Sequence, residues 1–526
     1  MSDANWTTDF LSRLVAADIA VAQTPLPSAT LWQIDAHHWR QFAELAIQQN
    51  IRWAAGWAEH DQDRFLINAC FEKHGVYLLL RTTVSAAKPA LPSQATVYPA
   101  ANRSERHTRD MFGIDFSGHP DNRPWTRHKA WSKQSHPLRK DFPVQGEPQT
   151  MTSPDLDYQF VKAYGAGVYE IPVGPVHAGI IEPGHFRFQA DGELILNLEE
   201  RLGYVHKGIE KIAEGRTPES LARLAGRISG DTTVGHSWAA CMAMERAAGV
   251  EIPPRAALIR EILAERERIA NHLGDVGAIC NDVAFVFAQM QFTRLRELWL
   301  RTNAGVFGHR LLMDRVVPGG VACDVTHEAG QSMLKDIARL RKELSDIVTA
   351  LDLNTSLEDR LYTAGYLSAE IAEAFGTVGY VGRASGQSFD VRRDAPYPPY
   401  DQATFKVPLE TEGDIAARVW IRLKEINAAL KLIEQFIGRL PIGGDLIAAW
   451  RTPAVGSEGL GIVEGWRGEI VAYIRFDGDN QIARFYPRDP SILNWPVFEK
   501  LTLNNIVPDF PVCNKSLNGS YSGNDL

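Results

Sequence analysis

Four long segments with a helical period constrain the fold of this chain more than any other feature. They span 255–272, 289–313, 328–351 and 414–440. The first brings apolar side chains close to one stripe, at Leu258, Ile262, Ile269 and Leu273, with Glu261, Glu265 and Glu267 elsewhere among arginines. Pro253 and Pro254 before it supply a helix start. Together these segments predict a bundle of long helices.

Patterns of period two lie on both sides of the bundle. After it, the segments 460–464, 469–476 and 481–485 predict a short β-meander. Before it, a helical pattern at 38–50 precedes strand patterns at 51–57, 65–71 and 76–83, and Gly75 suits a hairpin turn with a positive φ. The Pro- and Asn-rich tail to Leu526 is typical of a loop.

These patterns predict an α+β fold with two domains. A small N-terminal α/β domain covers residues 1–145, and a large helical-bundle domain with peripheral β-strands covers residues 171–526. Residues 146–170 are rich in Gln, Pro, Ser and Asp, which is typical of an interdomain linker.

Composition excludes several classes of function. The net charge of −9 and the absence of a long basic block make strong nucleic-acid binding unfavourable. No apolar run reaches the roughly 20 residues that span a bilayer, and the first residues do not resemble a signal peptide. Five scattered cysteines form no C-x-x-C pair, so neither a thiolate zinc site nor a disulfide framework is expected. We expect a cytoplasmic protein that touches a membrane only through partners.

Histidines, acids and glycines gather between Ile171 and Ala248. Two pairs suit proton transfer, because a donor of near-neutral pKa and a carboxylate that tunes it stand close in sequence: His185 with Glu182, and His236 with Asp231. The alternative is that these side chains cap turns and fill polar holes. From the residues alone, both interpretations stay open.

A dense charged block at 105–142 favours an interface loop over a core element. It contains Glu105-Arg-His-Thr-Arg-Asp-Met-Phe-Gly113, Gly118-His-Pro120 and His136-Pro-Leu-Arg-Lys-Asp-Phe-Pro143. The block resembles the signature of the 30-kDa-type subunit of respiratory complex I, with His107 where that family usually has Glu. The resemblance implies a peripheral docking domain without a cofactor of its own.

Residues from about 170 to 526 resemble the large subunit of group 4 membrane-bound nickel-iron hydrogenases and its relative, the 49-kDa-type subunit of complex I. The matching motifs follow in the family's order, from Gly174-Pro-Val-His177 and Glu182-Pro-Gly-His185 through Tyr204-Val-His206 to Arg383-Ala-Ser-Gly386 and Asp390-Val-Arg-Arg-Asp394. The resemblance implies one cavity built from the first hairpin, the region of Arg227 to Ser237 and the C-terminal segment.

Hydrogenases of this family hold nickel and iron with four thiolates from two C-x-x-C motifs. In this chain the matching positions carry Ser229 and Thr232 in the first motif, and Ser520 and Gly523 in the second. Hydroxyls are hard ligands and glycine offers none, so we expect no metal and no nickel-iron centre.

In complex I the same cavity, without metal, accepts a quinone head group between a histidine and a tyrosine. The resemblance places His185 at the histidine but Gly230 at the tyrosine, and Tyr521 is a possible substitute phenol. It therefore implies catalytic roles for His185, Glu182, Asp231 and His236, and ligand-binding roles for His177, Arg227, Ser229, Thr232 and Tyr521. Arg227 either steers an anionic intermediate or simply pairs with an acid.

The resemblance implies a core peripheral-arm subunit of a membrane-bound oxidoreductase resembling NADH dehydrogenase or hydrogenase-4. Quinone would be the substrate, and electrons would come from an iron–sulfur cluster in a small partner subunit, because this chain has no cluster-binding cysteines. A ferredoxin-like subunit and integral-membrane ion-transporting subunits would complete the complex, with this chain on the inner face of the cell membrane. One alternative is a non-catalytic scaffold, and another, disfavoured by the missing thiolates, is a hydrogenase.

Overall fold

The structure is a computed structural model of the whole chain, and it describes residues 6–27, 29–128, 131–132, 134–146, 158–179 and 181–526. Part of the predicted linker, 147–157, lies outside the described residues. The described chain contains 44% helix and 19% strand in several small sheets, which confirms the predicted α+β class. Among the described residues, no helix has the length and apolarity required to cross a membrane.

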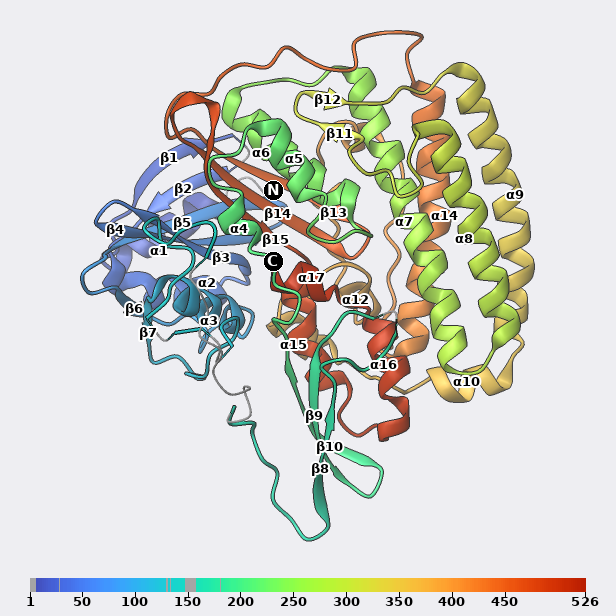
Figure 1. Cartoon of the computed structure of the whole chain (residues 1–526), viewed down its shortest axis with the longest axis horizontal. Helices are drawn as coiled ribbons and strands as arrows, with labels where there is room; N and C mark the ends of the chain where they lie inside the picture. The colour runs from blue at the N-terminus through green and yellow to red at the C-terminus, as the bar shows by residue number, and fades with distance from the viewer. Residues whose placement is uncertain (1–5, 28, 129–130, 133, 147–157, 180) are drawn as a thin grey trace.

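The N-terminal part is a five-stranded sheet with strand order β1-β2-β5-β4-β3 (Figure 1). The helix and the three strands predicted between residues 38 and 83 are confirmed, and Gly75 has a φ of 78° in the turn between the last two strands. No sequence pattern indicated the first helix or the first two strands. The elements are α1 (Trp6–Ala16), β1 (Ala22–Leu26), β2 (Ala29–Gln33), α2 (Trp39–Ile47), β3 (Arg52–Asp61), β4 (Arg64–Lys73) and β5 (Val76–Ser85).

The charged block predicted as an interface loop begins with a helix, α3 (Ala101–Phe112), whose charged side chains are mostly buried. The prediction of a loop was wrong for residues 105–112, because buried partners such as Asp121 and Glu210 neutralise the charges of this helix. Arg103 forms an ion pair with Glu200, and His107 Nε2 lies 2.9 Å from a carboxylate oxygen of Glu210. The helix therefore lies at the contact between the two halves of the chain.

Long helices stand side by side on the other side of the molecule (Figure 1). All four segments predicted from the helical period form helices, and α7 extends further than predicted, to Asp282. Unlike an amphipathic surface helix, α7 is buried on nearly every side, including its glutamates and arginines. These helices are α7 (Pro254–Asp282), α8 (Val286–Phe307), α9 (His327–Asp352) and α14 (Ile415–Arg439).

A three-stranded antiparallel sheet lies between the N-terminal sheet and the bundle (Figure 1). It confirms the predicted meander and consists of β13 (Glu458–Gly465), β14 (Gly468–Phe476) and β15 (Ile482–Arg488). Helix α6 (Thr233–Ala248) packs on β13 so closely that a Cβ at Gly461 would lie 2.0 Å from the Ala239 carbonyl oxygen. The sheet also contacts the N-terminal domain, since Glu469 accepts hydrogen bonds from Arg52.

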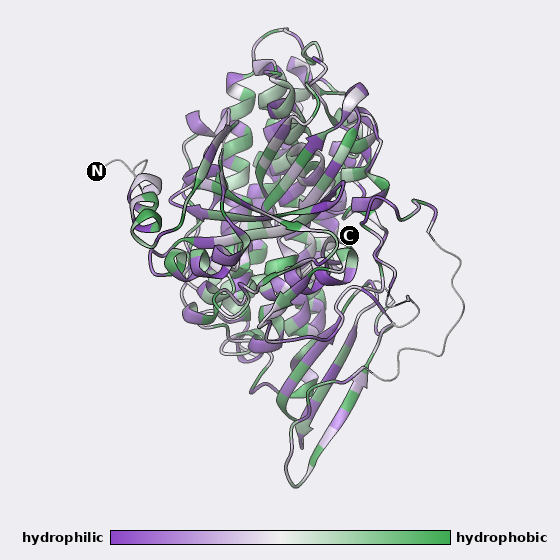
Figure 2. Cartoon of the chain, turned by 90° about the vertical axis from the view of Figure 1, so that its left-hand side faces the viewer, coloured by the Kyte–Doolittle hydropathy of each residue, from purple (hydrophilic) through white to green (hydrophobic). Residues whose placement is uncertain are grey.

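A second three-stranded sheet projects from the body of the molecule, and its strands carry hydrophilic and hydrophobic residues along their length (Figure 2). Its strands are β8 (Val168–Val173), β9 (His185–Asp191) and β10 (Leu194–Arg201). The described residues 174–179, which follow β8, carry the first histidine motif. The base of this sheet thereby positions that motif.

The C-terminal tail was wrongly predicted as a loop. It forms three short helices, α15 (Ser491–Leu501), α16 (Phe510–Leu517) and α17 (Tyr521–Asp525). Every residue of α17 is buried near the centre of the molecule (Figure 1). Helices this short depend on tertiary packing rather than on local propensity, so their composition gave little signal.

Candidate functional site

The two segments predicted to have lost the metal thiolates meet in the folded chain. Ser229 Oγ lies 2.9 Å from Ser520 Oγ, although the residues are 291 positions apart. Ser229 lies in the loop before α6, and Ser520 is the N-cap of α17, where its Oγ accepts a hydrogen bond from the Gly523 amide. Both serines are at most 5% exposed, so they form a buried hydroxyl pair.

An aspartate–arginine pair lies beside the two serines. Ser229 Oγ donates to Asp231 at 2.6 Å, and the Arg467 guanidinium forms two hydrogen bonds of 2.7 Å with the same carboxylate. Burial alone would raise the pKa of Asp231, but the Arg467 charge and the hydrogen bonds hold it well below its usual range. Thr232 Oγ1 donates to Asp231 and accepts from the Trp466 indole N–H.

Arg467 also reaches the C-terminal segment, because its Nε donates to the Asn518 carbonyl oxygen at 2.8 Å. Asn518 in turn donates from Nδ2 to Asp275 on α7, also at 2.8 Å. The turn between β13 and β14 thus ties the loop before α6 to the chain's last helices.

His236 and Asp231, predicted as a donor and its tuning carboxylate, do not pair. His236 Nε2 lies 2.8 Å from Asp489 Oδ2, and both side chains are at most 1% exposed. Burial opposes ionisation of Asp489, yet the His236 bond and nearby charges lower the pKa of this carboxyl below its usual value. Gly523 covers Asp489 so closely that a Cβ there would lie 2.5 Å from the carboxyl carbon.

His177 and Tyr521 meet where the segment after β8 packs against α17. The Tyr521 hydroxyl lies 3.3 Å from His177 Nε2 and accepts a hydrogen bond from Asn514. The ring of Tyr521 is buried, which raises the pKa of its phenol, whereas His177 is half-buried. Glu182, which is exposed, accepts a hydrogen bond of 3.0 Å from the Ser522 amide on the same C-terminal helix.

The second predicted pair, His185 with Glu182, is likewise not formed. His185 Nδ1 lies 3.4 Å from the Gly174 carbonyl oxygen, and its ring centroid lies 5.3 Å from that of Phe160. Burial lowers the pKa of His185, which favours a neutral imidazole. The two residues diverge because Glu182 turns to the C-terminal helix while His185 starts β9. The catalytic role of His185 stays a prediction.

Arg227 is exposed and forms an ion pair with Asp314, with bonds of 3.0 and 2.7 Å. This geometry matches the alternative in which Arg227 simply pairs with an acid. Gly230, at the position where a tyrosine is expected, is exposed.

Sequence reasoning missed three side chains that organise the site: Trp466, Arg467 and Asp489. Trp466 and Arg467 share a short turn and Asp489 follows a strand, so spacing gave no signal. The Trp-Arg-Gly turn at 466–468 was identified only as a strand connection.

The residues gathered here do not fit a nickel–iron centre. The side chains that meet are hydroxyls, carboxylates and a guanidinium, whereas nickel and low-spin iron require thiolates. The Arg467 cation beside Asp231 would also repel a metal cation. Within the described residues, no group of three or more His, Cys, Asp or Glu side chains is arranged to hold a metal ion.

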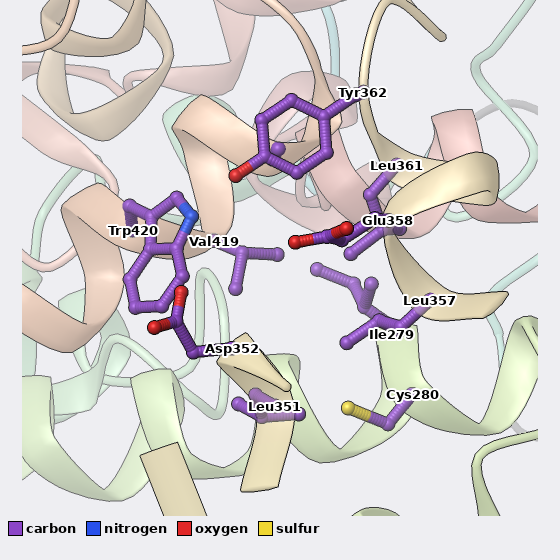
Figure 3. A pocket seen from close by; sticks show the side chains of 11 residues that line it. Ile279, Cys280, Leu351, Asp352, Leu357, Glu358, Leu361, Tyr362, Val419 and Trp420 are labelled. Carbon is purple, nitrogen blue, oxygen red and sulfur yellow. The ribbon is translucent and has the colours of Figure 1, made fainter. Parts of the chain in front are cut away.

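Two of the cavities among the described residues lie away from this site. One of about 740 Å³, mostly apolar, lies between α6, the start of α7 and the Tyr397–Pro399 segment. The other is a narrow apolar pocket at one end of the bundle, where Trp420 and Tyr362 face Leu351 and Ile279 (Figure 3). No predicted site residue lines either cavity.

The fold and the site together define a fused subunit of the respiratory NADH dehydrogenase and nickel-dependent hydrogenase class. Family models match in three places: the respiratory-chain NADH dehydrogenase 30 Kd subunit at residues 32–148, nickel-dependent hydrogenase at 207–274, and the respiratory-chain NADH dehydrogenase 49 Kd subunit at 282–458. The chain belongs to this family of oxidoreductase subunits.

Particular relatives agree with this assignment. Formate hydrogenlyase subunit 5 of Escherichia coli is 33% identical over 452 residues, covering 85% of this chain and 79% of that protein. A subunit of the NADH-quinone oxidoreductase of Phocaeicola vulgatus is 34% identical, covering 77% of this chain and 81% of that protein. A chain from the structure of the membrane-bound sulfane sulfur reductase, an archaeal respiratory membrane complex, matches with a TM-score of 0.65 and 26% identity, over 69% of this chain and 100% of that one.

Proposed function

We propose that this chain is a core peripheral subunit of a membrane-bound oxidoreductase complex and that a quinone-type acceptor binds beside the contact between His177 and Tyr521. The observation that carries the proposal is the contact between these two side chains, 3.3 Å apart, at the edge of the buried serine pair. An imidazole and a phenol this close together can both donate to one carbonyl oxygen of a quinone, and two-electron reduction takes up two protons.

The other parts of the complex follow from the same proposal. Electrons come from an iron–sulfur cluster in a small partner subunit and, before it, from a ferredoxin-like subunit, since cluster ligation requires cysteines in groups. Integral-membrane subunits couple the reaction to ion transport. The relatives support this setting, because they are named as an NADH-quinone oxidoreductase subunit and as a chain of a respiratory membrane complex.

The purified complex tests the proposal with His177→Ala and Tyr521→Phe. Each is expected to lower reduction of a water-soluble quinone at least tenfold while the complex stays assembled. His327→Ala and Tyr366→Phe, which change exposed residues, are matched controls and should keep full activity. His185→Ala shows which of the two histidines matters more for quinone reduction, since we expect a smaller loss of activity from this variant than from His177→Ala.

A scaffold without redox chemistry is the second candidate. It is favoured by the hydrogen bonds of the inner site, because Ser229, Ser520, Asp231 and Arg467 use their polar groups to bond to one another. The scaffold would be established instead by two results together. His177→Ala and Tyr521→Phe would leave quinone reduction unchanged, and altering the 105–142 block would prevent assembly of the complex.

A further inference from the structure

A network of ionisable side chains runs through the interior between α7, α14 and β13. None of its members is more than 2% exposed. The site described above does not include them, and buried ion pairs rarely add net stability. The members are Glu261, Glu265, Arg268, His272, Arg383, Asp390, Arg392, Tyr400, Glu425 and Glu464.

Arg383, on helix α12 (Gly379–Ala384), is the centre of one half of the network. Its guanidinium lies 2.6 Å from Glu425, 2.9 Å from Glu464 and 3.3 Å from Asp390. Glu425 also lies 2.8 Å from His272 Nε2. Glu464 and Asp390 share one guanidinium nitrogen, so their carboxyl groups are close neighbours.

Arg392 is the centre of the other half. It lies 2.7 Å from Asp390 and 2.9 Å from Glu265. Glu265 also pairs with Arg268 at 3.1 Å and accepts a hydrogen bond from the Tyr400 hydroxyl. The two halves therefore join through Asp390.

The charges of this network do not balance unless it holds protons. Five carboxyls face three guanidiniums, which leaves a difference of two (5 − 3), and guanidiniums stay protonated in proteins. Two unpaired negative charges in a dry interior are very unfavourable. Neutralising them requires two bound protons, because burial lowers the pKa of His272 and favours its neutral form.

Glu261 and Glu464 are the carboxyls that can hold these protons. Both oxygens of Glu261 are buried, and its polar neighbours are the Tyr400 hydroxyl, Glu265, Arg392 and Arg268. Burial and Glu265 raise the pKa of Glu261 well above its usual value. The pKa of Glu464 is raised by burial and by Asp390, against the opposing effect of Arg383, Arg392 and Arg268.

Tyr397 connects the network to the large cavity. It lines the cavity of about 740 Å³, its hydroxyl accepts a hydrogen bond from the Glu464 amide, and its ring centroid lies 5.2 Å from that of Tyr400. On the opposite side, the His272 ring contacts Trp466, the indole that bonds to Thr232 in the site. The network therefore spans from the large cavity to the candidate site.

We propose that the network is a proton store that holds two protons on Glu261 and on the Glu464–Asp390 pair, exchanges them with solvent through the cavity, and balances charge when electrons reach the site. Each uptake converts one carboxylate and one solvent proton into a carboxylic acid, and release reverses it. The store goes beyond the proposed function and does not depend on which acceptor binds.

Infrared spectroscopy of the purified chain tests the store, because a protonated carboxyl has a carbonyl absorption that a carboxylate lacks. Near neutral pH, Glu261→Gln and Glu464→Gln should each remove about one carboxylic-acid equivalent from the wild-type spectrum. Asp352→Asn, which changes an exposed carboxyl, is the control and should remove none. Retention of the full absorption in both glutamine variants would overturn the proposal.

Two further measurements keep the test decisive. If a glutamine variant does not fold, the wild-type chain is labelled with 13C at its glutamate carboxyls. A missing glutamic-acid band at neutral pH would then overturn the proposal.

The route of proton exchange through the cavity is tested separately. Gln402→Trp at the cavity rim should slow hydrogen–deuterium exchange of these carboxyls at least tenfold, whereas Lys335→Trp on α9 should not. An unchanged rate in Gln402→Trp would exclude the cavity as the entry.

Discussion

Replacing Arg383 with methionine should destabilise the chain strongly. The change leaves a side chain of similar length but removes the cation that Glu425, Glu464 and Asp390 share within 3.3 Å. All four side chains are at most 1% exposed, so water cannot replace the lost partner. Breaking a buried pair of this kind costs about 3–5 kcal/mol, because it leaves an uncompensated buried charge.

This cost converts into a measurable shift of the melting temperature. At about 2.1 cal/mol/K per residue, cooperative unfolding of this chain has an entropy of roughly 1.1 kcal/mol/K. A loss of about 3–5 kcal/mol therefore lowers Tm by roughly 3–5 °C. Calorimetry of wild type and variant in the same buffer measures it directly.

Arg393→Met is the matched control, because Arg393 lies on the same motif and also pairs with an acid, Asp394, at 2.8 Å. Its side chain is 41% exposed, so water screens the pair and the expected loss is about 0–1 kcal/mol. Adding Glu425→Gln to Arg383→Met should recover part of the loss, since one stranded carboxylate becomes a neutral amide. Equal losses in Arg383→Met and Arg393→Met would refute the reasoning.

Other outcomes follow from the same contacts. Gly461→Ala should lower the free energy of unfolding by about 1–3 kcal/mol in urea titrations, because its Cβ would lie 2.0 Å from the Ala239 carbonyl oxygen. Burial raises the pKa of Asp525 from 3.8 to about 6. Protonated Asp525 therefore contributes its whole stabilisation of the folded chain below pH 3.8, and this contribution is lost as the pH rises to about 6. Asp525→Asn should therefore gain up to about 3 kcal/mol over wild type near pH 8 and little near pH 3, whereas Asp445→Asn, at an exposed site, should show no such trend. Chelator treatment should leave Tm unchanged, and stoichiometric nickel in the purified chain would contradict the site described here.

The sequence predicts elements best where one period persists over many residues. The helix from Pro254 to Asp282 and the three strands after Glu458 were predictable for this reason. The burial of Glu261, Glu265 and Arg268 was not, since charged residues are normally exposed and partners such as Arg392 and Glu425 come from segments more than a hundred residues away in the chain. Only the folded chain shows that those charges neutralise one another.

The candidate site was predictable in part by resemblance. The motifs placed Ser229 and Ser520 at two positions where hydrogenases have metal-binding cysteines. In the structure their hydroxyl oxygens lie 2.9 Å apart. Pairing within the site was not predictable, because residues close in sequence diverge in space. His185 and Glu182 are three residues apart, yet one begins a strand and the other bonds to the C-terminal helix.

Hydrogen bonds and one ion pair give this site a cohesion that metal coordination gives elsewhere in the family. Arg467 alone joins Asp231, before α6, to the carbonyl of Asn518, before α17. These contacts close the site from three segments. The proton-holding network beneath Trp466 then becomes the feature to compare among relatives, since a pure scaffold would have no reason to keep so unfavourable a set of buried charges.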